Sequence, residues 1–281
     1  MDSGNIGFVL LCAAFVFVMT PGLAMFYGGL VRKKNVVNTM MTSIFIIGIG
    51  IVMWVLFGYS LSFAPSGNAF IGDFRWLGLE GVSLTEGYTD DASIPNMVFS
   101  AFQMMFAVIT PALITGAVAG RMKFKSIFIF TIFWSLIVYY PLAHMVWGQG
   151  GLLGADGIGA LDFAGGDVVH ISSGVSALVL CILLGKRHDY EHSIYRIHNI
   201  PTVVLGASLL MFGWFGFNAG SALAADGLAA HAFMTTGVSA AAAMLSWMLC
   251  DVIKNKKPTL IGASTGMVAG LVGITPGAGF V

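Results

Sequence analysis

The chain alternates long apolar segments with short polar ones. Each long segment holds about 20 or more residues, which is the length that a helix needs to cross the hydrocarbon core of a bilayer. The strands of a membrane β-barrel would instead give alternating segments of roughly ten residues. The pattern therefore predicts eight membrane-spanning helices, at about residues 6–29, 36–60, 96–119, 126–147, 162–184, 199–220, 231–253 and 259–281.

Composition supports an all-α integral membrane protein. Of the 281 residues, 57% are hydrophobic and 9% are charged, whereas a soluble domain carries about 25% charged residues. The net charge is zero, so nothing indicates a nucleic-acid partner. The three cysteines fall in apolar spans without metal-binding spacing, and we predict that they are buried apolar side chains: Cys12, Cys181 and Cys250.

Positive charge follows every second predicted span. Of the thirteen Lys and Arg residues, only Arg75 lies on the other side. Because basic residues concentrate in cytoplasmic loops, this pattern predicts an outside N-terminus and an outside 61–95 loop. We also predict that three histidines in or beside the inner loop after the fifth span are solvated: His188, His192 and His198.

A short motif occurs twice, as ITPA at residues 109–112 and as ITPG at residues 274–277, which is an offset of five spans. A repeat unit with an odd number of spans is inverted in the membrane, a design that many transporters use. A chance match of a common apolar tripeptide is the alternative. We predict one domain over 1–281, with a first repeat at about 1–190 and the start of a second at about 191–281.

Residues 162–170, DFAGGDVVH, place three ionisable groups at the start of the fifth span. Asp162 is suited to cap the helix N-terminus. His170 lies eight residues further along, about 12 Å deeper at ~1.5 Å per residue. An ionisable residue at that depth is a functional candidate, because its burial is costly unless it is paired or hydrated. The alternative is a neutral histidine bonded to a neighbouring helix, and Asp167 has no assigned role.

Aromatic and hydroxyl side chains gather toward the outer ends of three other spans. Phe102 and Phe106 are four residues apart and share one helix face. Trp147 ends the fourth span, and Phe217 and Ser221 end the sixth. Aromatic faces attract cations, and a hydroxyl can accept a hydrogen bond from an N–H donor. We predict a cation site if these residues meet, which spacing alone does not establish; Trp147 is also typical of an interfacial belt.

Three other classes of protein fit the sequence poorly. A retinal photoreceptor needs a buried lysine in its seventh span, and residues 231–253 contain none. A water channel would carry paired NPA motifs, which do not occur. A metalloenzyme is disfavoured because His144, His170 and Asp162 lack metal-ligand spacing such as HExxH. We therefore expect no enzymatic activity, no metal and no cofactor.

Several runs resemble the ammonium transporter family (Amt/Mep/Rh). They are LDFAGGDVVH (161–170), HMVWG (144–148), GWFGFNAGS (213–221) and FQMMF (102–106), with 19–35 and 258–276 similar to the family's first and eighth spans. The resemblance covers essentially the whole chain, in the family's order. It implies ammonium or ammonia transport across the plasma membrane by a homotrimer with one pore per subunit.

The resemblance also implies roles for the aromatic and hydroxyl residues. Phe106, Trp147 and Ser221 match the outer site that recruits ammonium. Phe106 and Phe217 match a stacked phenyl gate below that site. In this scheme the recruited cation loses its proton and crosses as ammonia. An ammonium sensor that uses the same site for signalling is the alternative.

Two further matches concern the DFAGGDVVH run. Asp162 matches a buried aspartate that supports the site by orienting backbone carbonyls. His170 matches the first of two paired pore histidines, which line the path and could relay the proton. The family fold has eleven spans in two inverted five-helix halves, and the second histidine belongs to the tenth. With eight of about eleven spans, we expect a fragment or a truncated, non-conducting product; the cytoplasmic tail that helps bind a PII-type regulator is absent.

Overall fold

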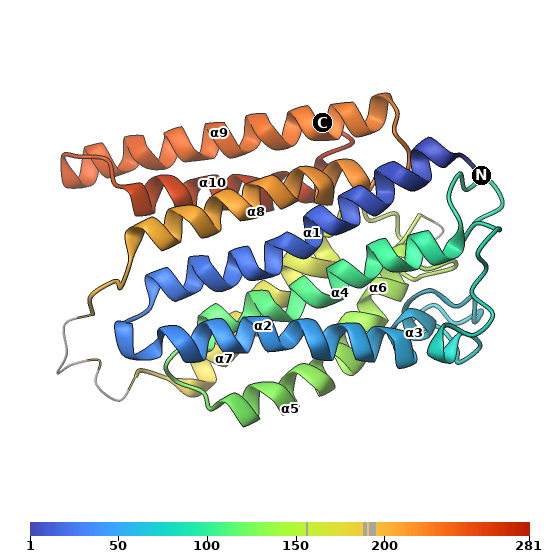
Figure 1. Cartoon of the computed structure of the whole chain (residues 1–281), viewed down its shortest axis with the longest axis horizontal. Coiled ribbons are helices and arrows are strands. Elements are labelled where there is room, and N and C mark those ends of the chain that lie inside the picture. The colour runs from blue at the N-terminus through green and yellow to red at the C-terminus, as the bar shows by residue number, and fades with distance from the viewer. Residues whose placement is uncertain (156, 188–189, 191–194) are drawn as a thin grey trace.

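The computed structural model describes residues 1–155, 157–187, 190 and 195–281. Over these residues the protein is a bundle of long helices without strands (Figure 1). Among the described residues, eight helical segments are long and apolar enough to cross a membrane. The predicted all-α membrane fold is therefore confirmed, and so is each of the eight predicted spans.

In the part of the chain that the structure describes, the spans are built from ten α-helices, and π-helical turns join or precede them at three places. Their bounds are α1 Ser3–Leu30; α2 Val36–Met53, which continues through Trp54–Gly58 into α3 Tyr59–Phe63; α4 Asn96–Val118; α5 Phe124–Trp134, which continues through Ser135–Tyr139 into α6 Tyr140–Trp147; the π-helical turn Gly166–Ile171 followed by α7 Ser172–Leu184; α8 Ile200–Gly220; α9 Gly227–Asn255; and α10 Leu260–Ile274.

Two helix starts differ from the prediction for local reasons. The fifth span begins at Gly166 rather than at residue 162, because Gly165 adopts a left-handed conformation with φ +117° that interrupts the helix. The seventh span begins at Gly227 rather than at 231, because the Asp226 side chain accepts a hydrogen bond from the Ala229 amide at 2.9 Å.

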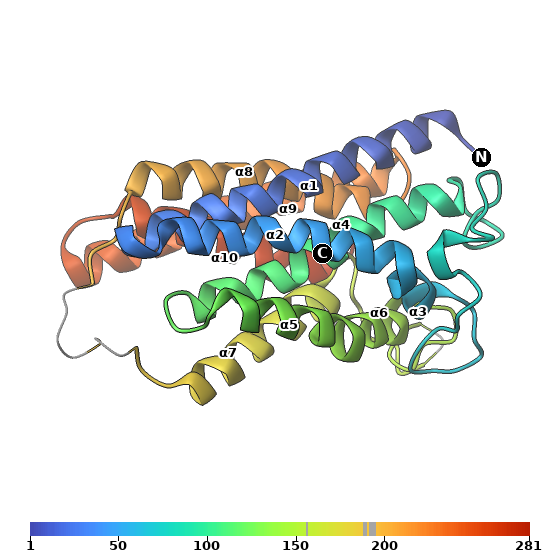
Figure 2. The same ribbon diagram turned by 60° about the horizontal axis from the view of Figure 1, so that its bottom comes forward.

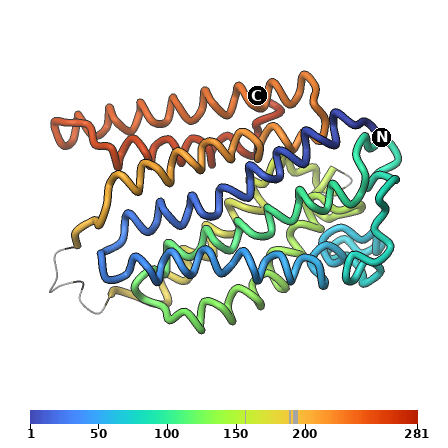
Figure 3. Tube along the Cα trace, in the orientation of Figure 1, coloured from blue at the N-terminus to red at the C-terminus, as the bar shows by residue number. Residues whose placement is uncertain are grey.

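The trace runs back and forth between two ends of the bundle (Figure 3). One end carries the N-terminus, and we call it the N-terminal end. The C-terminal ends of α1, α4, α7 and α9 gather at the other end (Figures 1 and 2). We call this the basic end, because the segments there carry all the Lys and Arg except Arg75.

Helices α1 and α8 pack closely along their length because glycines face each other across their interface. A Cβ atom on Gly206 of α8 would lie 2.6 Å from the carbonyl oxygen of Gly22 on α1, and one on Gly29 would lie 2.8 Å from the carbonyl oxygen of Asn199. Small residues allow backbones to approach where lipid supplies no hydrophobic driving force. These glycines therefore set the distance between the two helices.

Several sequence predictions concern side-chain exposure. Cys12 is buried as predicted, but Cys181 is half-buried and Cys250 is exposed. The prediction is wrong for Cys250 because α9 packs against the bundle on one side only and its other face is open. His198 is exposed as predicted, whereas His188 and His192 lie outside the described residues.

The α1–α8 interface gives a stability prediction. Replacing Gly206 with valine should lower the free energy of unfolding by about 1–3 kcal/mol, because the added side chain meets backbone atoms of α1. Thermal unfolding of the purified protein measures the change. The matched control is Gly48→Val on α2, where nothing lies within 4 Å of an added Cβ. Equal melting temperatures for the two variants would contradict this account of the interface.

Candidate functional site

The carboxylate of Asp162 organises the start of the fifth span. Its Oδ1 accepts hydrogen bonds from the amides of Gly165 and Gly166 at 2.5 and 2.7 Å, and its Oδ2 from those of Asp167 and Val168 at 2.8 and 3.1 Å. The first turn of a helix leaves its amides without partners inside the helix. One side chain therefore satisfies four amides in a largely buried turn.

Asp162 acts from outside the helix rather than as the residue directly before it. It lies four positions ahead of Gly166, so the predicted capping role is kept but its geometry is different. Burial raises the pKa of the Asp162 carboxyl, while the four amide donors act in the opposite direction and favour the ionised form. The carbonyl oxygen of Asp162 also accepts a hydrogen bond from Trp147 Nε1 at 3.0 Å.

The same turn is joined to the end of the eighth span. The amide of Phe163 donates to the carbonyl oxygen of Pro276 at 2.9 Å. Gly166 packs so closely on the Pro276 ring that a Cβ atom there would overlap it. The glycines of DFAGGDVVH are therefore required by the turn and by this close approach.

A cavity of about 560 Å³ opens near the N-terminal end, and we call it the N-terminal cavity. Phe106, Trp147 and Ser221 all line it. The ring centroids of Phe106 and Trp147 are 6.0 Å apart, with the rings nearly perpendicular at 89°. Ser221 Oγ donates to the carbonyl oxygen of Phe217 at 2.9 Å, so its lone pairs remain free to accept.

Two phenyl rings lie next to this cavity. The centroids of Phe106 and Phe217 are 4.3 Å apart, with 34° between the ring planes. Phe217 is fully buried, and the His170 ring, which lines the second cavity described below, lies 5.9 Å from it at 19°. The order of side chains is therefore N-terminal cavity, Phe106, Phe217 and His170.

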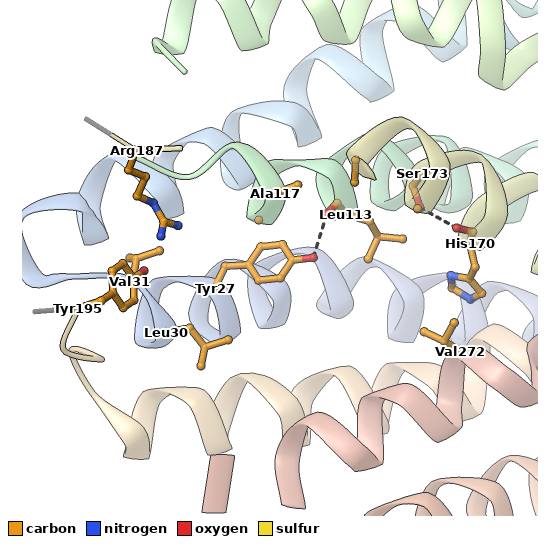
Figure 4. A pocket seen from close by; sticks show the side chains of 13 residues that line it. Tyr27, Leu30, Val31, Leu113, Ala117, His170, Ser173, Arg187, Tyr195 and Val272 are labelled. Carbon is orange, nitrogen blue, oxygen red and sulfur yellow. Dashed lines mark hydrogen bonds between the residues drawn. The ribbon is translucent and has the colours of Figure 1, made fainter. Parts of the chain in front are cut away.

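A second cavity of about 490 Å³ begins at His170 and reaches toward the basic end; we call it the basic-end cavity (Figure 4). Figure 4 shows His170 at one end and Arg187 and Tyr195 at the other, with Tyr27 between them. The Tyr27 hydroxyl donates to the carbonyl oxygen of Leu113 at 2.9 Å. His170 Nε2 is buried and has no hydrogen-bond partner within the described parts of the chain.

The structure thus brings together every residue that the sequence singled out for the site. It also adds Trp214, whose ring lies 5.2 Å from that of His170 and whose Nε1 donates to Thr275 Oγ1 at 2.9 Å. Trp214 lies three residues before Phe217, so helical spacing could have identified it. His144 has a structural role, because its two ring nitrogens lie 3.1 and 2.7 Å from the carbonyl oxygens of Ser62 and Asn68, and the nitrogen that carries the proton donates to its carbonyl.

The fold and this site define a polytopic helical membrane protein with an aromatic-lined cavity, a buried ring pair and a histidine in series. The Ammonium Transporter Family matches residues 7–281, and the chain belongs to this family. The resemblance noted in the sequence is confirmed. The family consists of transport proteins rather than enzymes.

Individual relatives agree with this assignment. The chain is 53% identical over 281 residues to an ammonium transporter of Bacillus subtilis, covering 100% of this chain and 68% of that protein. It matches the crystal structure of Saccharomyces cerevisiae Mep2 with 38% identity and a TM-score of 0.90, covering 100% of this chain and 64% of that one. A structure titled Sensor Amt Protein matches with 29% identity and a TM-score of 0.88, covering 99% and 69%. The chain therefore spans about two thirds of these relatives.

The Asp162 network gives a second stability prediction. Asp162→Ala should lower the free energy of unfolding by about 3 kcal/mol or more, because four amides lose a charged acceptor in a buried turn. Asp167→Ala removes the same charge from the same turn but leaves the acceptor in place. Thermal unfolding of both variants measures the change in stability. An equally large loss of stability in Asp167→Ala would contradict this account, because the effect would then come from net charge rather than from the lost acceptor.

Proposed function

We propose that this chain forms the recruitment site and the path of an ammonium transporter. The observation that carries the proposal is the serial order of the N-terminal cavity, the Phe106–Phe217 pair, His170 and the basic-end cavity. Family membership and the named relatives support ammonium as the substrate. The residue roles follow from the chemistry of the side chains at each step.

Ammonium binds in the N-terminal cavity. The faces of Phe106 and Trp147 attract the cation, an effect that grows when water is excluded. Ser221 Oγ accepts one N–H, because its own hydrogen is committed to the Phe217 carbonyl. Potassium has a similar size but no N–H donors, so an acceptor that requires a directional hydrogen bond favours ammonium.

The ring pair then acts as the gate. An intact cation passing the buried rings of Phe106 and Phe217 would lose its hydration without gaining fixed ligands, which costs many kcal/mol. Ammonium therefore gives its proton to water in the N-terminal cavity, and neutral ammonia crosses. His170 lines the path beyond the rings, where its unpartnered Nε2 can bond to the arriving ammonia. A relay of the proton through His170 is the alternative to its release into water. Asp162 supports the site by fixing the turn that holds Trp147 and His170.

The wider assembly forms part of the same proposal. The N-terminal end faces the outside of the plasma membrane, because the basic end then lies in the cytoplasm. The protein assembles as a homotrimer, and a PII-type protein is its cytoplasmic regulator. An inverted repeat at about 1–190 and 191–281 is also part of the proposal, and its support is the recurrence of ITPA (109–112) as ITPG (274–277).

A sensor is the second candidate function. The likeness to the structure titled Sensor Amt Protein favours it, because the same fold serves that protein. A sensor would bind ammonium in the same N-terminal cavity but would not need to conduct it. Binding without uptake is therefore the outcome that separates the two functions.

Uptake of labelled methylammonium by cells without other ammonium transporters tests the proposal. Ser221→Ala should raise KM about tenfold, because a hydrogen bond to a charged group is lost, and Trp147→Leu should raise it about 3–30-fold through loss of the cation–π contact. The control is Trp247→Leu on α9, an exposed tryptophan outside the N-terminal cavity, which should leave KM unchanged. No uptake above background by the unmodified protein would contradict transport.

A further inference from the structure

Gln103 lies in the wall of the N-terminal cavity, on α4 between Phe102 and Phe106. Its side chain is 8% exposed, and its Oε1 is buried with no hydrogen-bond partner among the residues that the structure describes. A buried amide oxygen without a partner is unfavourable, and native structures rarely leave one without a reason. A ligand with N–H donors would provide that reason.

The geometry of α4 places this amide beside the aromatic residues of the site. Gln103 is three residues from Phe106, so the two side chains are neighbours on the helix surface. The last torsion of glutamine is broad, and rotation about it exchanges the positions of Oε1 and Nε2. The carbonyl oxygen can therefore turn into the cavity that Phe106, Trp147 and Ser221 also line.

We propose that Gln103 Oε1 is a second hydrogen-bond acceptor for the cation in the N-terminal cavity and thus a specificity-determining residue. Ammonium carries four N–H donors, and Ser221 Oγ accepts one of them in the function proposed above. The amide of Gln103 accepts a second, while the rings of Phe106 and Trp147 face the remaining donors. This inference rests on the proposed function and extends the same site.

Titration calorimetry of the purified protein in lipid nanodiscs with ammonium chloride tests the inference. Gln103→Met keeps the length of the side chain but removes the acceptor, so ammonium affinity should fall about tenfold or more. Gln103→Glu keeps an acceptor and adds a negative charge, so it should bind at least as tightly as the unmodified protein. The matched control is Asn255→Met, which also replaces an amide by methionine but lies on α9 outside the cavity wall; its affinity should stay within about twofold.

Each outcome has a distinct meaning. Equal affinities for Gln103→Met and the unmodified protein would overturn the inference and leave the proposed function intact. Weak binding by both Gln103→Met and Gln103→Glu would also overturn it, since Gln103 would then only shape the cavity. Absence of ammonium binding to the unmodified protein would contradict the proposed function itself. If Gln103→Met does not fold, Gln103→Glu decides alone, and weaker binding than the unmodified protein overturns the inference.

Discussion

The bonds from the Asp162 carboxylate to four amides are the interaction on which the site depends. They fix the turn between Asp162 and Gly166, and that turn sets three further positions. Trp147 is held by the Asp162 carbonyl, Phe163 is joined to Pro276 at the end of the eighth span, and His170 follows one turn later. A charged residue beside an apolar span is therefore explained by the backbone groups that it satisfies.

The second organising feature is the separation of two cavities by aromatic rings. The N-terminal cavity offers ring faces and a hydroxyl acceptor, which suit a cation with N–H donors. Beyond Phe106 and Phe217 the path offers His170 and a mostly apolar wall. In the proposed function, this change of environment explains why the charged ammonium ion binds in the cavity but neutral ammonia crosses. Moving an unpaired charge past the buried rings is unfavourable, whereas neutral ammonia passes without that cost.

The sequence alone predicted much of the fold, because a bilayer demands apolar helices of nearly fixed length. It failed at helix starts such as Gly166 and Gly227, where a left-handed glycine and an aspartate cap decide the boundary. It identified Phe106, Trp147, Phe217 and Ser221 but not their convergence, which depends on helix packing across long sequence separations. Trp214 was missed although its spacing from Phe217 was readable, and Gln103 was missed because its lack of a partner exists only in the folded chain.

The central claim is that the Phe106–Phe217 pair divides one path into two compartments, and cysteine labelling from each side of sealed vesicles tests it most directly. Single cysteines at Ala222 in the N-terminal cavity and Ala177 in the basic-end cavity would be introduced after the three native cysteines are replaced by alanine. A membrane-impermeant cationic thiol reagent should modify Ala222→Cys only from the N-terminal side and Ala177→Cys only from the basic side. Equally fast modification of Ala177→Cys from the N-terminal side would contradict the account.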